Sequence, residues 1–487
     1  MDLVISAVAS EVVNRFISFV SNKYSSQACL KENLEILQHL LLRAHTIFEE
    51  AEGRYISNSR MLVQLKTLTE DMFRGYDVLD TYLPLLKIGG IEEVSGLSIW
   101  PFAITRCLHM AESTTVSYQV QSAIKTLETT VANMTEFIMI LAGCRRMFRS
   151  PYSSYLYIDN FMFGRQVEKQ QVINILMQGN PFRSSAPTVL PIIGGCRVGK
   201  KTLVGNICSD DRIRSYYPCI LHFRAESGDE IQKIHPESFK NVRTLVTIEF
   251  FSDVADKYWQ KFCSILVALT GKGSKVIIIS RLEKLIRFGT VDPIRINSFS
   301  REEYSYLFKV LAFGSANPMD HPQLALVGKE LATVFQGSLV MLNVYASVLR
   351  SNMNVQFWTR VLELFRVIIH NNLARFGEHP KTLLEKDGRA VDITGFSVSS
   401  LSGSGNTSSF RLGLLTTTGK DASKADELPT MSFGDIIAGS KILPHKFRLV
   451  WESRLPPYTV ICANCAAEYP QHPVSQRKKR RRLCMSL

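Results

Sequence analysis

Long hydrophobic runs are missing from this 487-residue sequence, since no stretch reaches the ~20 apolar residues that a membrane-spanning helix needs. A signal peptide is missing as well, because the N-terminal stretch has no basic segment and includes Asp2, Glu11 and Arg15. Cysteine pairs are lacking too: the ten cysteines stand singly, apart from Cys462 and Cys465. Free thiols in a reducing compartment fit this pattern better than a disulfide framework, so we expect a cytoplasmic protein.

Acidic residues are fewer than basic ones, and the formal net charge is +13. The run RKKRRR, Arg477–Arg482, supplies six of these charges, so the excess is partly local. The charge therefore gives no strong case for nucleic-acid or membrane binding by the whole protein. The run itself is a nuclear-import signal, a contact for an anionic partner, or a solvated end of the chain.

The segment CANC, Cys462–Cys465, together with His472 and Cys484, is a candidate zinc site. A single CxxC without a second spaced pair is a weak signal, so free thiols are the favoured interpretation and no metal site is predicted.

The first third of the chain has the pattern of a helical bundle. Apolar residues recur there at steps of three and four, which gives a helix one apolar face. Four such faces predict an antiparallel four-helix bundle over residues 1–147. The faces run from Val4 to Val20, Leu30 to Ala51, Leu62 to Leu79, and Val116 to Leu141, the last including Ile138.

Two acidic residues, Asp77 and Asp80 in YDVLD, stand on the third of these helices. They are candidates for docking a basic partner surface. A solvated helix face is an equally good interpretation of the same pair.

A phosphate-binding loop is indicated by IIGGCRVGKKTLV, Ile192–Val204. Gly194, four further residues, Gly199 and Lys200 keep the P-loop spacing, between an expected strand (Val189–Ile193) and an expected helix. Glycines let backbone N–H groups converge on phosphate oxygens, the helix N-terminus adds its dipole, and the lysine reaches the β- and γ-phosphates.

The loop departs from the P-loop pattern at three positions. Lys201 stands where a Ser or Thr hydroxyl normally ligates Mg²⁺, and an ammonium has no lone pair to offer a metal. Thr202 offers a hydroxyl one residue later, but one residue rotates it by ~100° around the helix. Cys196 and Arg197 require an ordinary backbone conformation in the loop. We expect binding of a diphosphate to tolerate these changes better than metal-assisted hydrolysis, so a role for Mg²⁺ is doubtful.

Further strands are expected in TLVTIE, which ends at Glu249, and in Ser274–Arg281, with the helical stretch DKYWQKFCSILVALTG between them. The alternation predicts a parallel α/β sheet, in which Gly199, Glu249 and Arg281 gather at the carboxyl ends of the strands. Glu249 is the candidate catalytic residue, with Asp253 four residues on. A surface carboxylate at a strand end is the alternative.

The order of these segments resembles the NB-ARC domain of plant disease-resistance proteins. The resemblance rests on FMFGRQVEKQQVINILM, the P-loop, TLVTIEFFSDVADKYWQKF, GSKVIIISRLEKL and GSLVMLNVYASVLR, and the preceding bundle is similar to the Rx-type coiled-coil domain of a cereal group of these receptors. The family implies an ADP/ATP switch, with nucleotide-binding residues 155–300, a helical subdomain 301–376, and a tail 377–487 outside the resemblance.

The resemblance also implies roles for single residues. Arg281 matches an arginine that senses the terminal phosphate, and Glu249 stands where an Asp–Asp pair ends the Walker B strand. Asp77 and Asp80 match two acidic positions of an E-D-V-I-D motif, which implies contacts with immune receptors or with host or pathogen proteins. The candidate adenine- and phosphate-binding residues are Phe163, Gly164, Arg165, Gly194, Gly195, Gly199, Lys200, Lys201, Thr202 and Leu203.

Beyond Phe376 the family pattern is not continued: we find no winged-helix subdomain, no M-H-D triplet and no leucine-rich repeat. The Ser/Thr/Gly-rich segment from Asp392 to Pro429 is expected to be largely disordered. Three hypotheses follow: an immune switch that binds ADP or ATP and self-associates, a weak ATPase using Lys200 and Glu249, and an adaptor that needs no nucleotide.

Overall fold

The computed structural model places the chain in two compact units. The first comprises residues 1–358 with 453–459, and the second comprises residues 359–452 with 460–487. The expected first helix and the basic run at the C-terminal end lie outside the described residues. Those residues are 29–92, 114–146, 162–179, 187–225, 241–385, 390–392, 411–417, 428–432, 444, 446–452 and 460–468.

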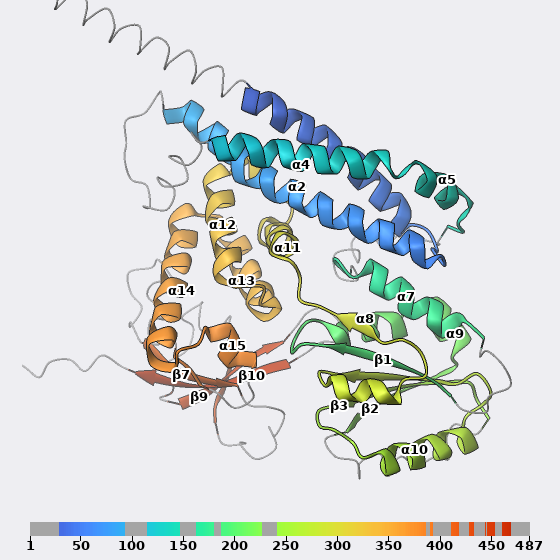
Figure 1. Cartoon of the computed structure of the whole chain (residues 1–487). Coiled ribbons are helices and arrows are strands. Elements are labelled where there is room, and N and C mark those ends of the chain that lie inside the picture. The colour runs from blue at the N-terminus through green and yellow to red at the C-terminus, as the bar shows by residue number, and fades with distance from the viewer. Residues whose placement is uncertain are drawn as a thin grey trace, which may run out of the picture. The chain divides into compact units, whose positions relative to one another are not determined.

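Helices with one apolar face form the N-terminal layer of the first unit (Figure 1). Their faces meet in one core, where Leu37, Leu68 and Leu127 are fully shielded from solvent. Most residues predicted to lie on the apolar faces are buried in this core. The helices are residues 29–52, α2 (Ser59–Glu92), α4 (Thr114–Ala132) and α5 (Thr135–Gly143).

The expectation of one continuous helix from Val116 to Leu141 is wrong at a single place. The chain leaves the helix at Asn133–Met134 and starts again as α5. The break changes which residues face the core, so that Phe137 is fully buried while Ile138 is 45% exposed. Helical spacing counted across this break therefore predicts that Ile138 is buried, whereas the buried residue is its neighbour Phe137.

A parallel sheet of five strands lies at the centre of the nucleotide-binding region predicted from the sequence. Its strand order is β2-β3-β4-β1-β5, and every pairing is parallel. Parallel strands need crossovers, which here include helices. The strands are β1 (Thr188–Gly194), β2 (Cys219–Ala225), β3 (Thr244–Phe250), β4 (Lys275–Ser280) and β5 (Ile294–Ile296).

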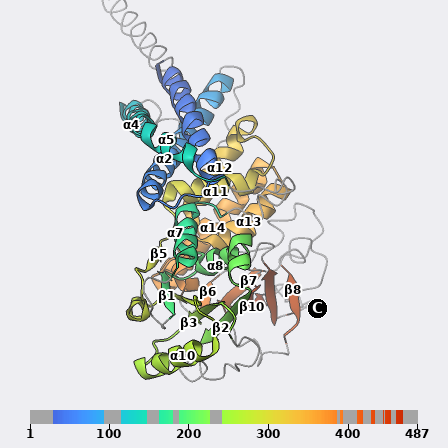
Figure 2. The same cartoon turned by 90° about the vertical axis from the view of Figure 1, so that its right-hand side faces the viewer.

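Helices cover both faces of this sheet, which explains why its central strands are apolar at nearly every position. On one face, Ile192 and Ile277 pack with residues of α7 and α8. On the other, Ile248 and Ile278 pack with residues of α10 (Figure 2). The covering helices are α7 (Gln166–Met177), α8 (Lys200–Cys208) and α10 (Asp256–Leu269), and the short α9 (Asp211–Tyr216) follows α8.

The sequence identified β1, β3 and β4, but not β2 and β5. Strand β2 is an edge strand with partly exposed residues, and its sequence CILHFRA mixes apolar and charged residues. Strand β5 has three residues, too few for a recognisable period.

More helices follow β5 in the chain. The first, α11, begins with a capping box in which Ser300 and Glu303 each bond the backbone N–H of the other. The next two pack with it, and the last crosses from the first unit into the second. They are α11 (Arg301–Phe313), α12 (Pro322–Val334), α13 (Leu339–Ser351) and α14 (Val355–Phe376); the 3-10 turns η2 (Glu283–Phe288) and η3 (Pro318–Asp320) precede α11 and α12.

The second unit contains a further five-stranded sheet, of order β6-β7-β10-β9-β8. Asn372 on α14 ties this sheet to the helix: its amide donates to the carbonyl of Asp392 and accepts from the N–H of Asp392. The elements are α15 (Pro380–Glu385), β6 (Ala390–Asp392), β7 (Arg411–Thr417), β8 (Thr430–Ser432), β9 (Lys446–Glu452) and β10 (Val460–Glu468).

One expectation about the tail changes as a result. Strand β7 lies inside the segment expected to be largely disordered. Cys462 and Cys465 both lie on β10. His472 and Cys484 lie outside the described residues.

None of the helices in the described part of the chain combines the length and apolarity that crossing a bilayer requires.

One arginine joins the end of the helix over residues 29–52 to the end of α5. Nη1 of Arg54 lies 3.0 Å from the carbonyl oxygens of Leu141, Ala142 and Cys144, and Nε donates to Glu50 at 2.7 Å. The last carbonyls of a helix have no partner within the helix, so the guanidinium caps α5 from outside.

We predict that Arg54→Lys loosens α5, because an ammonium cannot reach the carbonyls and Glu50 together. Amide hydrogen exchange in α5 should quicken by about tenfold, the cost of one charge-assisted hydrogen bond. Arg60→Lys is the control, since Arg60 is exposed at the start of α2. Equal exchange rates in both variants would contradict the capping role.

Candidate functional site

The loop between β1 and α8 is built on two glycines that no other residue can replace without strain. A Cβ on Gly194 would lie 2.2 Å from the carbonyl oxygen of Ile296 on β5. Gly199 caps the N-terminus of α8 with φ = +94°. The spacing seen in the sequence therefore reflects two backbone constraints, one at each end of the loop.

The side chains between these glycines are arranged differently from expectation. Arg197 has φ = +55°, so the expectation of an ordinary backbone conformation is wrong at this residue. A left-handed conformation costs a non-glycine residue about 1–2 kcal/mol. Arg197 is exposed, while Cys196 and Gly195 are half-buried and exposed respectively. The backbone is therefore strained at Arg197, and the side chain of this residue is exposed to solvent.

Lys200 folds back over the loop. Its ammonium donates to the carbonyl oxygens of Gly194, at 2.7 Å, and Gly195. Burial lowers the pKa of Lys200; Arg281 adds to this effect, while Cys196 and Glu249 oppose it. Lys200, Glu249 and Arg281 are thus brought together at the carboxyl edge of the sheet, as the strand pattern predicts.

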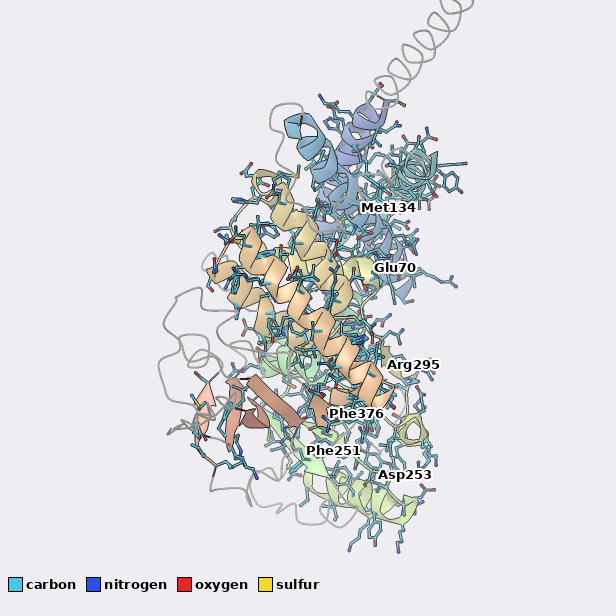
Figure 3. The ribbon with its side chains drawn as sticks, turned by 90° about the vertical axis from the view of Figure 1, so that its left-hand side faces the viewer. Glu70, Met134, Phe251, Asp253, Arg295 and Phe376 are labelled. Atoms are coloured by element: carbon cyan, nitrogen blue, oxygen red, sulfur yellow. The ribbon has the colours of Figure 1, made fainter. Side chains whose placement is uncertain are left out.

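Glu249, the candidate catalytic carboxylate, is held by two cations. Its Oε2 atom lies 3.0 Å from Nζ of Lys201 and 3.2 Å from Nε of Arg224. The carboxylate is 16% exposed, whereas the side chains of Lys201 and Arg224 are 40% and 48% exposed, so water screens both contacts in part. Asp253, also considered from the sequence, instead pairs with Arg287 at 2.9 Å beyond the end of β3 (Figure 3).

The other loop candidates contribute differently. Leu203 on α8 is completely buried, so its side chain belongs to the core beneath the helix. Thr202 is half-buried in the first turn of the same helix. A cavity of about 590 Å³ lies between α8 and strands β2 and β3, with Lys201, Arg224 and Glu249 in its wall. Lys200 and the loop glycines are not among the residues that line it.

The segment expected to pack on adenine and ribose turns at Gly164, with φ = +62°. A Cβ there would lie 2.8 Å from the ring of Phe299. Arg165 is 7% exposed; its guanidinium lies 4.3 Å from the centroid of that ring and donates to the carbonyl of Asn297. This arginine anchors the segment to the chain after β5.

Phe163 belongs to an aromatic cluster that joins α2 to α11. Its ring stacks on Tyr306 with centroids 5.9 Å apart and lies 5.1 Å from Phe73. The side chain expected to meet adenine is thus in contact with the helical layer, which links that layer to the nucleotide-binding region.

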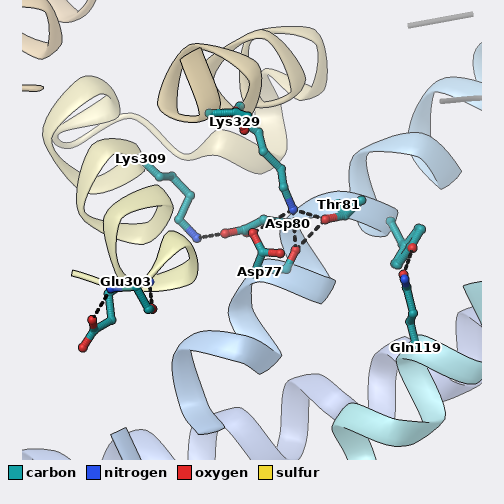
Figure 4. Close-up of polar contacts among 10 residues, drawn as sticks. Asp77, Asp80, Thr81, Gln119, Glu303, Lys309 and Lys329 are labelled. Carbon is teal, nitrogen blue, oxygen red and sulfur yellow. Dashed lines mark hydrogen bonds and ion pairs between the residues drawn. The ribbon is translucent and has the colours of Figure 1, made fainter. Parts of the chain in front are cut away.

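The acidic residues Asp77 and Asp80 have basic partners within the chain itself (Figure 4). Lys309 on α11 approaches Asp80 at 2.5 Å, and Lys329 on α12 approaches Asp77 at 2.8 Å. Lys329 also donates to the hydroxyl of Thr81. All four charged side chains are at most one quarter exposed. Neither a solvated face nor a free docking surface describes this pair in the present conformation.

Comparison with known proteins finds relatives with one shared description. The chain is 25% identical over 347 residues to disease resistance protein RGA2 of Solanum bulbocastanum, an alignment that covers 66% of this chain and 34% of that protein. It is 26% identical over 233 residues to RGA4 of the same species, also named as a disease resistance protein, covering 43% and 23%. Its relatives are plant disease-resistance proteins.

The aligned parts span about a quarter to a third of the length of these two relatives. No protein-family model matches the chain.

Three functional side chains were missed from the sequence. Arg224 lies on β2, a strand that the apolar pattern did not reveal. Lys309 and Lys329 follow Asp80 and Asp77 by more than two hundred residues, so only the packing of α2 against α11 and α12 brings them together. The sequence signal that pointed to Lys309 and Lys329 was indirect: it was the acidic pair Asp77 and Asp80, whose basic partners lie far away in the sequence.

We predict that Asp80→Lys loosens the contact between α2 and α11 by placing two ammonium groups together. Adding Lys309→Asp should restore it, because the charges are then exchanged. Hydrogen exchange of α2 and α11 in the single and double variants gives the coupling energy, which we expect to be about 1–3 kcal/mol. Additive effects of the two changes would mean that the ion pair does not couple these helices.

Proposed function

We propose that this protein is an ADP/ATP-binding switch of plant disease resistance, with weak or no hydrolysis. The observation that carries the proposal is the loop between β1 and α8. Gly194 and Gly199 fix its backbone at the carboxyl edge of a parallel sheet, and Lys200 and Arg281 bring positive charge to it. A helix N-terminus with such neighbours suits a phosphate.

The role in plant immunity is inferred from the relatives, RGA2 and RGA4, which are named as disease-resistance proteins. We place the protein in the cytoplasm, with the nucleus as a second site through the basic run Arg477–Arg482. Its partners on this proposal are an adenine nucleotide, further copies of the chain, and immune, host or pathogen proteins that meet the helical layer.

Weak hydrolysis follows from the state of Glu249. A general base must be free to accept a proton from water, and this carboxylate is already shared by Lys201 and Arg224. A bound nucleotide therefore acts by being held, and exchange of ADP for ATP changes the state of the protein.

On this proposal, the contact between α2 and helices α11 and α12 is the one that the switch would release. Asp77 and Asp80 hold α12 and α11, and Phe163 connects the same region to the segment before α7. A nucleotide that moves Phe163 or Arg165 would bias this contact, which is the physical requirement for a population shift.

We predict that the purified protein binds ADP in titration calorimetry and that Lys200→Ala weakens binding about 10- to 100-fold, the worth of a charge-assisted hydrogen bond. Lys272→Ala is the matched control, because Lys272 lies in the turn at the opposite end of β4. If neither the wild type nor the control binds ADP, the proposal fails.

A second candidate is an adaptor that needs no nucleotide. The packing of Phe163 among aromatic residues favours it, because this ring is satisfied without adenine. Partner binding that is unchanged by Lys200→Ala, in a protein that holds no nucleotide, would select the adaptor.

A further inference from the structure

The residue after the loop lysine occupies an unusual electrostatic position. In P-loop proteins, a hydroxyl at this place and a carboxylate near the end of a neighbouring strand hold Mg²⁺ beside the β- and γ-phosphates. Here the first of these is Lys201 and the second is Glu249. Their side chains meet: the ammonium nitrogen lies 3.0 Å from the carboxylate oxygen.

A second cation contacts the carboxylate of Glu249. Nε of Arg224 approaches the same oxygen of Glu249 at 3.2 Å. One carboxylate carries one negative charge, so the two cations beside it leave the group with a net positive charge. A divalent ion bound to Glu249 would lie beside two positive charges, and Coulomb repulsion from them disfavours its binding.

No substitute ligand set lies nearby. Asp253, the next carboxylate after β3, is paired with Arg287, which also contacts Asp256 at 3.0 Å. In the part of the chain that the structure describes, no three His, Cys, Asp or Glu side chains come together as a metal site. The residues at the loop therefore do not fit Mg²⁺, whose preferred ligands are oxygen atoms in octahedral array.

The two lysines at the start of α8 point in different directions and have different partners. Adjacent helical residues point ~100° apart, so Lys200 and Lys201 approach the loop from different sides. Lys200 covers the loop carbonyls, whereas Lys201 reaches towards β3 and Glu249. Positive charge therefore stands on the side where the metal of a P-loop protein is held.

We propose that the ammonium of Lys201, held by Glu249, replaces Mg²⁺ as the counterion of the bound diphosphate. Arg224 is a positioning residue that fixes Glu249. Nucleotide binding by this chain is then independent of divalent metal, for ATP as well as ADP. This inference rests on the proposed nucleotide site and adds to it the identity of the counterion.

The test is calorimetric titration of the full chain with ADP and with ATP, once in EDTA and once in excess MgCl₂. The dissociation constant should agree within about twofold between the two buffers, whereas a metal-dependent site changes by about tenfold or more. Stronger binding in MgCl₂ by that factor would overturn the inference while leaving the nucleotide site intact. Absence of binding in both buffers would overturn the nucleotide site as well.

Substitution of Lys201 separates its role from that of the loop. Lys201→Thr should weaken ADP binding in EDTA about tenfold and gain a response to MgCl₂, because it removes the fixed charge and supplies a hydroxyl. Lys272→Thr is the matched control and should change neither value. Lys201→Gln, which keeps the length without the charge, repeats the test if the threonine variant misfolds. Unchanged affinity in EDTA for either variant would contradict the counterion role.

Discussion

The close approach of β1 to β5 at Gly194 is the constraint on which the candidate site depends. There is no room for a side chain beside Ile296, so position 194 requires glycine, and Gly199 starts α8 from a left-handed conformation. The start of α8 then lies at the carboxyl edge of the sheet. Every charge in the site, from Lys200 to Glu249, takes its position from this turn and from the parallel strands beside it.

Electrostatics then sets what the site can do. The described charges around the loop come mostly from cations, and the half-buried carboxylate among them, Glu249, is already paired with Lys201 and Arg224. Such an arrangement attracts a phosphate and leaves little to activate water. The acidic residues of α2 are likewise already paired, because Asp77 and Asp80 form ion pairs with lysines of the same chain. Phe163 and its aromatic neighbours join the segment before α7 to the helical layer, which on the proposed function would link a bound nucleotide to that layer.

Much of this was accessible from the sequence because it follows from local rules. Period and glycine spacing identified the helices of the N-terminal layer, α8, α10, three of the five central strands, and the loop residues. What local rules could not supply was the effect of breaks and distant partners: the turn at Met134 that buries Phe137 in place of Ile138, the edge strand that carries Arg224, and the lysines that neutralise Asp77 and Asp80. Arg197 was misjudged because strain that the surrounding loop tolerates cannot be seen in a motif.

The central claim is that the loop holds an adenine nucleotide. Its most direct test is mass spectrometry of the small molecules released when the natively purified protein is denatured. The account predicts ADP or ATP in close to equimolar amount with the protein. Protein that is well folded by circular dichroism, releases no nucleotide and takes up none when ADP is supplied would contradict it.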